Sequence, residues 1–264
     1  MNALIILGLL VVLMLTGMPI SISLGLTVLS FLFFLTEVPI ESVALKLFTG
    51  IEKFEIMAIP FFILAGNFLT HGGVAKRMIG FATSMVGHWH GGLGLGGVVA
   101  CALFAAVSGS SPATVVAIGS ILLPAMVKAG FPKSFGAGVI TTSGALGILI
   151  PPSIVMVMYS VSTNTSVGAL FMAGVIPGLL LAFFLGLTTW YRAKKNNYPC
   201  QPKATWAERW VAFRKAIWGL LLIVVVMGGI YSGMFTPTEA AAMSAVYAFV
   251  VAVFVYKDMG LKDV

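Results

Sequence analysis

Charged residues are missing from long stretches of this chain, and this pattern restricts the folds that it can adopt. Residues 78–127 contain no Asp, Glu, Lys or Arg, and residues 134–191 contain none either. Four shorter stretches lack them as well: 1–36, 56–75, 216–238 and 240–256. A helix that crosses a bilayer needs about 20 predominantly apolar residues, so these stretches have room for many crossings.

The composition excludes a soluble fold. Of the 264 residues, 59% are hydrophobic and only 9% are charged, whereas soluble domains carry about 25% charged residues. Strands of a membrane barrel would show short alternating segments, but the apolar runs here are continuous. The sequence therefore predicts an all-α polytopic membrane protein. Residues 1–36 lack a basic region and a small-residue cleavage site, so we expect membrane helices there rather than a removable signal peptide.

Apolar runs, glycines and prolines divide the chain into expected helices. These cover residues 3–16, 19–35, 56–70, 73–87, 93–107, 113–128, 134–149, 153–165, 167–191, 216–235 and 237–256. The acidic loop 36–55 includes Glu37, Glu41, Glu52 and Glu55 against Lys46 and Lys53.

The loop 192–215 sets the expected orientation. It carries seven basic residues against the single acid Glu208, and short basic loops lie on the cytoplasmic side. Counting back from it places the N-terminus and the loop 36–55 on the outer side of the membrane, with 93–107 and 113–128 forming a re-entrant hairpin. Two full crossings over 93–128 would return the chain to the same face, so the charges fit both alternatives.

An internal repeat is visible at the two ends of the chain. Residues 15–35 resemble residues 233–253, with Pro19 aligned to Pro237, and in both a proline restarts a helix after a short turn. The crossing count gives the two copies opposite orientations, as in the inverted repeats of secondary transporters. The alternative is that two proline-initiated membrane helices look alike by chance. If the repeat is real, its first unit occupies about 1–200 and its second is cut off at Val264.

The sharpest local feature is Ser108-Gly109-Ser110-Ser111-Pro112, which lies within the uncharged stretch 78–127. Non-helical backbone at membrane depth is tolerated only inside protein or beside a water-filled cavity. Carbonyls at the end of 93–107 have no helical partners and suit Na⁺, and amides at the start of 113–128 suit a carboxylate. The alternative is a tight turn between two ordinary crossings.

A second interruption follows in Gly144–Ser153, where Pro151 and Pro152 lack amide donors and leave carbonyls unpaired one turn back. Thr141, Thr142 and Ser143 place hydroxyl groups just before it. Facing the hairpin tip, this segment would complete a Na⁺ site from main-chain oxygens. The alternative is a simple proline kink.

Other polar residues in apolar surroundings have simpler explanations. Thr236 and Glu239 have capping-box spacing, so we expect Glu239 to cap a helix rather than to act in the membrane. His88-Trp89-His90 fits an interfacial position, with Trp89 at the level of the lipid headgroups. No apolar segment holds a paired acid and base, or a nucleophile with a partner, so we do not expect an enzyme.

Three motifs carry a resemblance to a known family: FAAVSGSSPATVVAIGSILLPAM (104–126), GALGILIPPSIVMVMY (144–159) and GGIYSGMFTPTEAAA (228–242). With IPFFILAGNFL (59–69), they resemble the large membrane subunit (M-type) of tripartite ATP-independent periplasmic (TRAP) transporters. The resemblance implies a Na⁺-driven importer of organic acids such as C4-dicarboxylates or sialic acid in the bacterial inner membrane. It also implies an inverted-repeat, elevator-type fold. A small four-helix membrane subunit and a periplasmic substrate-binding protein would be partners, with no nucleic acid involved.

Under this resemblance the chain divides into scaffold helices (1–72), a cytoplasmic-side arm helix (73–92), a transport domain (93–166), a scaffold helix (167–191), the cytoplasmic loop (192–215) and a truncated second repeat (216–264). The expected Na⁺ ligands are oxygens near Ser108, Ser110, Ser111, Gly144, Gly147, Ile150 and Pro152. The expected substrate contacts are Gly109, Ser111, Thr141, Thr142 and Ser143. Family members extend beyond Val264, which puts transport by this polypeptide alone in doubt. A binding-protein-independent anion symporter and a non-transporting scaffold subunit remain the alternatives.

Overall fold

The computed structural model describes residues 2–36, 39, 45, 48–50 and 52–260, and among these the regular structure is entirely helical. The expected residues Glu37, Glu41 and Lys46 of the acidic loop lie outside the described part. The chain divides into two compact units, Met1–Lys53 and Phe54–Val264, and each is described by itself.

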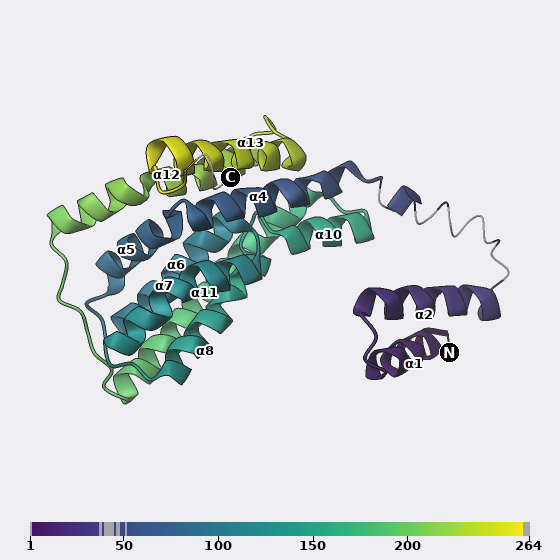
Figure 1. The fold of residues 1–264 in the computed structure, drawn as a ribbon, viewed down its shortest axis with the longest axis horizontal. Coiled ribbons are helices and arrows are strands. Elements are labelled where there is room, and N and C mark those ends of the chain that lie inside the picture. Colours follow the sequence, from purple (N-terminus) through teal and green to yellow (C-terminus); the bar gives the residue numbers. More distant parts are fainter. Residues whose placement is uncertain (1, 37–38, 40–44, 46–47, 51, 261–264) are drawn as a thin grey trace. The chain divides into compact units, whose positions relative to one another are not determined.

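The first unit is a helical hairpin (Figure 1). Helix α1 (Asn2–Leu15) and helix α2 (Ile20–Leu35) pack against each other. Gly17 makes the turn between them with a positive φ of 80°, and Pro19 occupies the N-cap of α2. Side chains of Ser23 and Thr27 are buried, and the Thr27 hydroxyl donates to the Ser23 carbonyl one turn back.

The second unit begins with the 3-10 turn η1 (Phe54–Met57), and its described residues, 54–260, contain ten α-helices and a final π-helical turn. They are α4 (Ala58–His71), α5 (Val74–Val86), α6 (Gly92–Ser108), α7 (Ser111–Lys128), α8 (Lys133–Gly144), α9 (Leu146–Leu149), α10 (Ile154–Thr163), α11 (Val167–Lys195), α12 (Trp206–Tyr231), α13 (Pro237–Val250) and η2 (Val251–Val255). The expected helices are therefore present, with most boundaries shifted by one to three residues.

In the part of the chain that the structure describes, five helical stretches are long and apolar enough to cross a membrane: Phe54–His71, Ser111–Lys128, Val167–Lys195, Trp206–Tyr231 and Pro237–Val255. A sixth is the pair Lys133–Leu149 and Ile154–Thr163, which bends by 42° at the two prolines. Helices α1, α2 and α6 are apolar but shorter. This confirms an all-α polytopic membrane protein with a broken helix.

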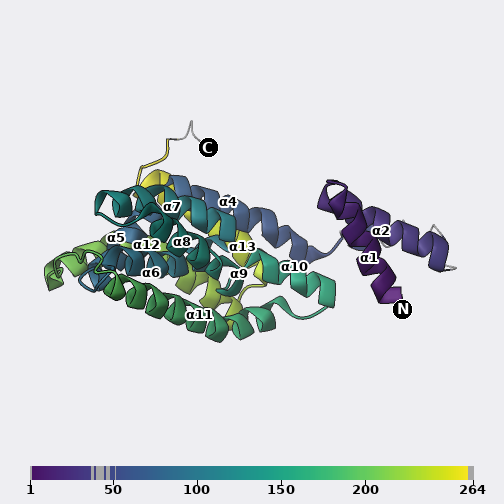
Figure 2. The same ribbon diagram turned by 90° about the horizontal axis from the view of Figure 1, so that it is seen from below.

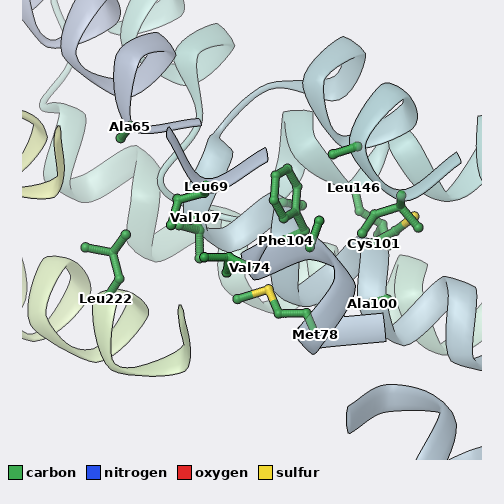
Figure 3. Packing of buried hydrophobic residues seen from close by; sticks show 14 of the residues in the cluster. Ala65, Leu69, Val74, Met78, Ala100, Cys101, Phe104, Val107, Leu146 and Leu222 are labelled. Carbon is green, nitrogen blue, oxygen red and sulfur yellow. The ribbon is translucent and has the colours of Figure 1, made fainter. Parts of the chain in front are cut away.

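Helix α6 forms the centre of the second unit. Fourteen of its 17 residues are buried, and it contacts α5, α7, α8 and α11. Figure 3 shows Phe104 and Val107 of α6 packed near Leu69 of α4 and near Val74 and Met78 of α5. Figure 2 shows α11 running beside α6 along one side of the unit. Because α6 is enclosed, the hairpin tip at its C-terminal end is held inside the protein.

The expected loop 192–215 is shorter in the structure. Helix α11 continues to Lys195 and α12 begins at Trp206, so only residues 196–205 are non-helical. The new start is fixed by a capping box, in which the Thr205 hydroxyl accepts from the Glu208 amide and the Glu208 carboxylate accepts from the Thr205 amide. Charged residues end an apolar stretch but do not end a helix. The basic residues on either side of 196–205 are therefore helical.

The expected cap at the start of the last helix is confirmed. The Glu239 carboxylate accepts from the Thr236 amide at 2.8 Å, the Thr236 hydroxyl accepts from the Glu239 amide at 3.3 Å, and Pro237 occupies the first turn of α13. In both proline-initiated hairpins a positive-φ glycine, Gly17 or Gly233, precedes the restart. The opposite orientation of the two copies stays a prediction.

Candidate functional site

The hairpin tip is a two-residue turn, Gly109 and Ser110, that only glycine fits well at its first position. Helix α6 ends at Ser108, Gly109 has φ +60° and ψ 12°, and Ser110 is extended before α7 begins at Ser111. Left-handed backbone costs a residue with a Cβ about 1–2 kcal/mol. Ser108 and Gly109 are buried and Ser110 and Ser111 are half-buried.

Hydroxyl groups hold this turn in shape. The Thr114 hydroxyl donates to the Ser110 carbonyl at 2.8 Å, and the Thr114 amide donates to the same oxygen at 3.0 Å. Because the Thr114 hydroxyl has only one proton, the Ser108 hydroxyl, 3.1 Å away, must donate to it. Sequence reasoning did not select Thr114, because a threonine one turn into an apolar helix carries no distinguishing signal.

The broken helix has its interruption at Ile150–Ser153, where Ile150 is extended and α10 begins at Ile154. Pro151 and Pro152 supply no amide protons, so the carbonyls of Gly147 and Ile148, four residues earlier, have no helical donor. The break therefore leaves two main-chain oxygens without their normal partners.

The tip and the break meet backbone to backbone. The Ile154 amide donates to the Gly109 carbonyl at 3.0 Å. A Cβ added to Gly109 would lie 2.7 Å from the Pro152 carbonyl oxygen, and one added to Gly147 would lie 2.8 Å from the Ser110 carbonyl carbon and the Ser111 nitrogen. The structure thus joins the two interruptions that the sequence singled out.

The other expected Na⁺ ligands lie around this joint with different neighbours. A Cβ on Gly144 would be 3.6 Å from the Ser111 carbonyl oxygen but only 2.1 Å from a Val115 methyl group. The Ile150 side chain packs beside Gly178 of α11. On the opposite side, Gly66 of α4 backs the tip, with its Cβ position 3.4 Å from the Cβ of Ser108.

Two buried hydroxyl groups near the joint have no hydrogen-bond partner. Ser143 is 1% exposed and Ser153 is fully buried, and the Oγ atoms of both are unpaired. Ser153 is the N-cap of α10, yet its side chain caps nothing. An unsatisfied buried hydroxyl costs about 1–3 kcal/mol, so both oxygens would gain from a bound ligand. Ser153 belongs to the predicted break but was not among the selected ligands.

The chemistry of the joint is that of neutral oxygen donors. No group of three or more His, Cys, Asp or Glu side chains able to hold a metal occurs in the part of the chain that the structure describes. Carbonyl and hydroxyl oxygens suit hard cations, and the residues present fit Na⁺ in this respect.

The five residues expected to contact substrate differ in exposure. Gly109 and Ser143 are buried and Ser111 is half-buried, whereas Thr141 and Thr142 are exposed. The Thr142 hydroxyl donates to the Gly138 carbonyl of its own helix at 2.8 Å. The two threonines therefore stand on a more open face of α8 than the joint itself, and their role stays a prediction.

Comparison with known proteins gives one consistent result. Residues 7–264 match the family described as "Tripartite ATP-independent periplasmic transporter, DctM component". A C4-dicarboxylate TRAP transporter large permease protein of Rhodobacter capsulatus is 76% identical over all of this chain and 63% of its own length.

Two relatives from Vibrio cholerae are more distant. A C4-dicarboxylate TRAP transporter large permease protein is 55% identical over 94% of this chain and 55% of its own length. A sialic acid TRAP transporter large permease protein is 39% identical over 95% of this chain and 58% of its own length. The chain thus spans between about half and two thirds of the length of these relatives.

Proposed function

We propose that this chain, which belongs to the family of DctM components of tripartite ATP-independent periplasmic transporters, supplies the first Na⁺ site and part of the substrate site of a sodium-coupled importer of organic acids. The observation that carries the proposal is the joint between the hairpin tip and the broken helix. There, buried main-chain oxygens and the unpaired Ser143 and Ser153 hydroxyls gather without any charged side chain.

The proposed Na⁺ site uses oxygens near Ser108, Ser110 and Ser111 of the tip and near Gly144, Gly147, Ile150 and Pro152 of the break. The Ser110 carbonyl already accepts two hydrogen bonds from Thr114, so its role would be to shape the turn. The Gly147 carbonyl is the better ligand, since Pro151 leaves it without a helical donor.

The proposed substrate is a C4-dicarboxylate. The relative with 76% identity is named for that substrate, whereas the relative named for sialic acid is 39% identical. The first turn of α7 offers unpaired amides and the positive end of a helix dipole to a carboxylate. We assign Gly109 and Ser111 of the tip, with Thr141, Thr142 and Ser143 at the end of α8, to the substrate.

The proposed cycle needs more than this chain. We infer a periplasmic binding protein that delivers the acid, a small four-helix membrane subunit, and an elevator movement in the bacterial inner membrane. In that movement residues 93–166 would slide against scaffold helices in 1–72 and 167–191, with residues 73–92 as the arm. The basic segment 192–215 would face the cytoplasm.

The test is uptake of a labelled C4-dicarboxylate into proteoliposomes that contain the complete permease, its small subunit and the binding protein. We expect uptake with an inward Na⁺ gradient and none with K⁺. Replacing Ser153 by Ala should raise the Na⁺ concentration for half-maximal uptake at least fivefold. Ser120→Ala on α7, where an exposed hydroxyl bonds only to its own helix, should leave it unchanged.

Two outcomes would overturn this function. Equal uptake in Na⁺ and K⁺ would exclude sodium coupling. Uptake that does not depend on the binding protein would favour the simpler anion symporter.

A further inference from the structure

Two adjoining cavities lie along α6, beginning at the end of the helix that is far from the hairpin tip. The larger, about 480 Å³, is a groove lined only by apolar and aromatic side chains, including Leu95, Val99 and Leu103 of α6 and Phe183 and Leu187 of α11. The smaller, about 360 Å³, is lined by His88, Trp89, His90 and Trp190. Trp89 and Trp190 line both cavities, so an apolar groove continues into a polar one.

The groove follows the helix axes. Leu95 and Leu103 are eight residues apart, which corresponds to about 12 Å along a helix. The indole rings mark its open polar end, and tryptophan is enriched at the level of lipid headgroups because its ring is apolar and its N–H is polar. The groove therefore runs from an interfacial end toward the interior of the bilayer.

Positive charge and an unpaired ring nitrogen lie at the polar end. The Lys194 ammonium lies 5.1 Å from the centre of the Trp190 ring, and Arg192 and Lys195 are in the same last turn of α11. The Nδ1 atom of His88 is buried without a hydrogen-bond partner. None of the four residues that line this cavity is acidic. These features match a phosphate group.

We propose that these cavities bind one anionic membrane phospholipid, with an acyl chain in the groove between α6 and α11 and its phosphate beside His88, His90 and Lys194. A partner helix fits less well, because its apolar face would match the groove but not the positive charge of Lys194 beside Trp190 at the polar end. A single chain with a charged end matches both the shape and the change in polarity.

The site would act on the helix that positions the tip. Helix α6 carries the hairpin tip at its other end, and a lipid between α6 and α11 fills space that would otherwise leave their side chains without contacts. The lipid would thus stabilise α6 against α11 in the arrangement of this structure, from which the proposed sliding of residues 93–166 would start.

The test measures phospholipid retained by the complete permease, purified after reconstitution in vesicles of phosphatidylglycerol or phosphatidylcholine. Native mass spectrometry should show one retained phosphatidylglycerol per permease and at least fivefold less phosphatidylcholine. Ala102→Trp would fill the groove and should lower phosphatidylglycerol retention at least fivefold. Ile176→Trp, at a residue of α11 that is 70% exposed and outside the groove, should not.

A second variant tests the proposal even if Ala102→Trp does not fold. The double change His90→Ala and Lys194→Gln alters only exposed polar side chains and should lower phosphatidylglycerol retention to the level of phosphatidylcholine. Equal retention of the two lipids by the unmodified protein, retention unaffected by either variant, or a polypeptide found in the groove would each overturn the proposal.

Discussion

Replacing Gly109 by Ala should separate the hairpin tip from the broken helix. Gly109 has a positive φ of 60°, and a Cβ there would lie 2.7 Å from the backbone oxygen of Pro152. A backbone oxygen cannot turn away as a flexible side chain can, so the tip and the break must move apart. That movement would stretch the hydrogen bond that the Ile154 amide donates to the Gly109 carbonyl.

The magnitude follows from these two effects. Left-handed backbone with a Cβ costs about 1–2 kcal/mol, and loss of one hydrogen bond costs about 0.5–1.5 kcal/mol net. Together they weaken the docked state by roughly 1.5–3.5 kcal/mol, which corresponds to an about 10- to 300-fold increase in the open population.

Hydrogen exchange of the Ile154 amide measures this directly, because Gly109 supplies its acceptor. Exchange in Gly109→Ala should be faster by that factor. The matched control is Gly130→Ala in the turn after α7, since Gly130 has φ +90° but nothing within 4 Å of the added Cβ. It carries the backbone strain without the collision, so Ile154 should exchange at the original rate. Unchanged exchange in Gly109→Ala, or equal acceleration in both variants, would refute the docking argument.

Three further results are expected. Gly147→Ala should lower uptake by the assembled transporter at least tenfold, because the added Cβ would lie 2.8 Å from the Ser110–Ser111 backbone. In the control Gly138→Ala, on the same broken helix, the added Cβ has nothing within 4 Å, and the change should raise helix stability by about 0.5–1 kcal/mol. Equal uptake by the two variants would contradict this prediction. Cys200 is exposed and Cys101 is buried, so a membrane-impermeant maleimide should label only Cys200, and only in inside-out vesicles; labelling in intact spheroplasts would reverse the orientation. Phe104→Ala should cost about 3–5 kcal/mol in a reversible unfolding assay in detergent, since this side chain is fully buried, and a loss below 1 kcal/mol would contradict its central position.

Local signals made the two interruptions predictable. The Ser-Gly-Ser-Ser turn needs a left-handed glycine, and the two prolines remove amide donors, so each break is encoded within a few residues. The signal for the start of α13 is equally local, because Thr236 and Glu239, three residues apart, form the two hydrogen bonds of a capping box.

Hydrogen bonds between backbone groups that are distant in the sequence were not predictable in the same way. Nothing in the sequence around residue 109 specifies that its carbonyl pairs with the Ile154 amide, since that pairing depends on how α6 and α8 pack. The unpaired state of Ser153 has the same origin, because a serine at an N-cap usually bonds to its own helix. The start of α12 differs from the expected residue 216, because seven basic residues indicate a loop, whereas the capping-box spacing of Thr205 and Glu208 starts the helix.

Under the proposed function, the joint would serve both a cation and an anion without a charged side chain. Four helix ends converge there: the carboxyl ends of α6 and α9, and the amino ends of α7 and α10. Each end carries roughly half an elementary charge, negative at the carbonyls and positive at the amides, and the four ends nearly cancel. An empty site of this kind is close to neutral, so the proposed elevator movement would carry it through the low-dielectric bilayer without an exposed charge. If a Na⁺ ion bound at the carbonyl ends and a carboxylate at the amide ends, the charges of the two ligands would cancel. Binding either one alone would leave a net charge in the joint, and this cost gives the physical basis for cooperative binding of the proposed ion and substrate.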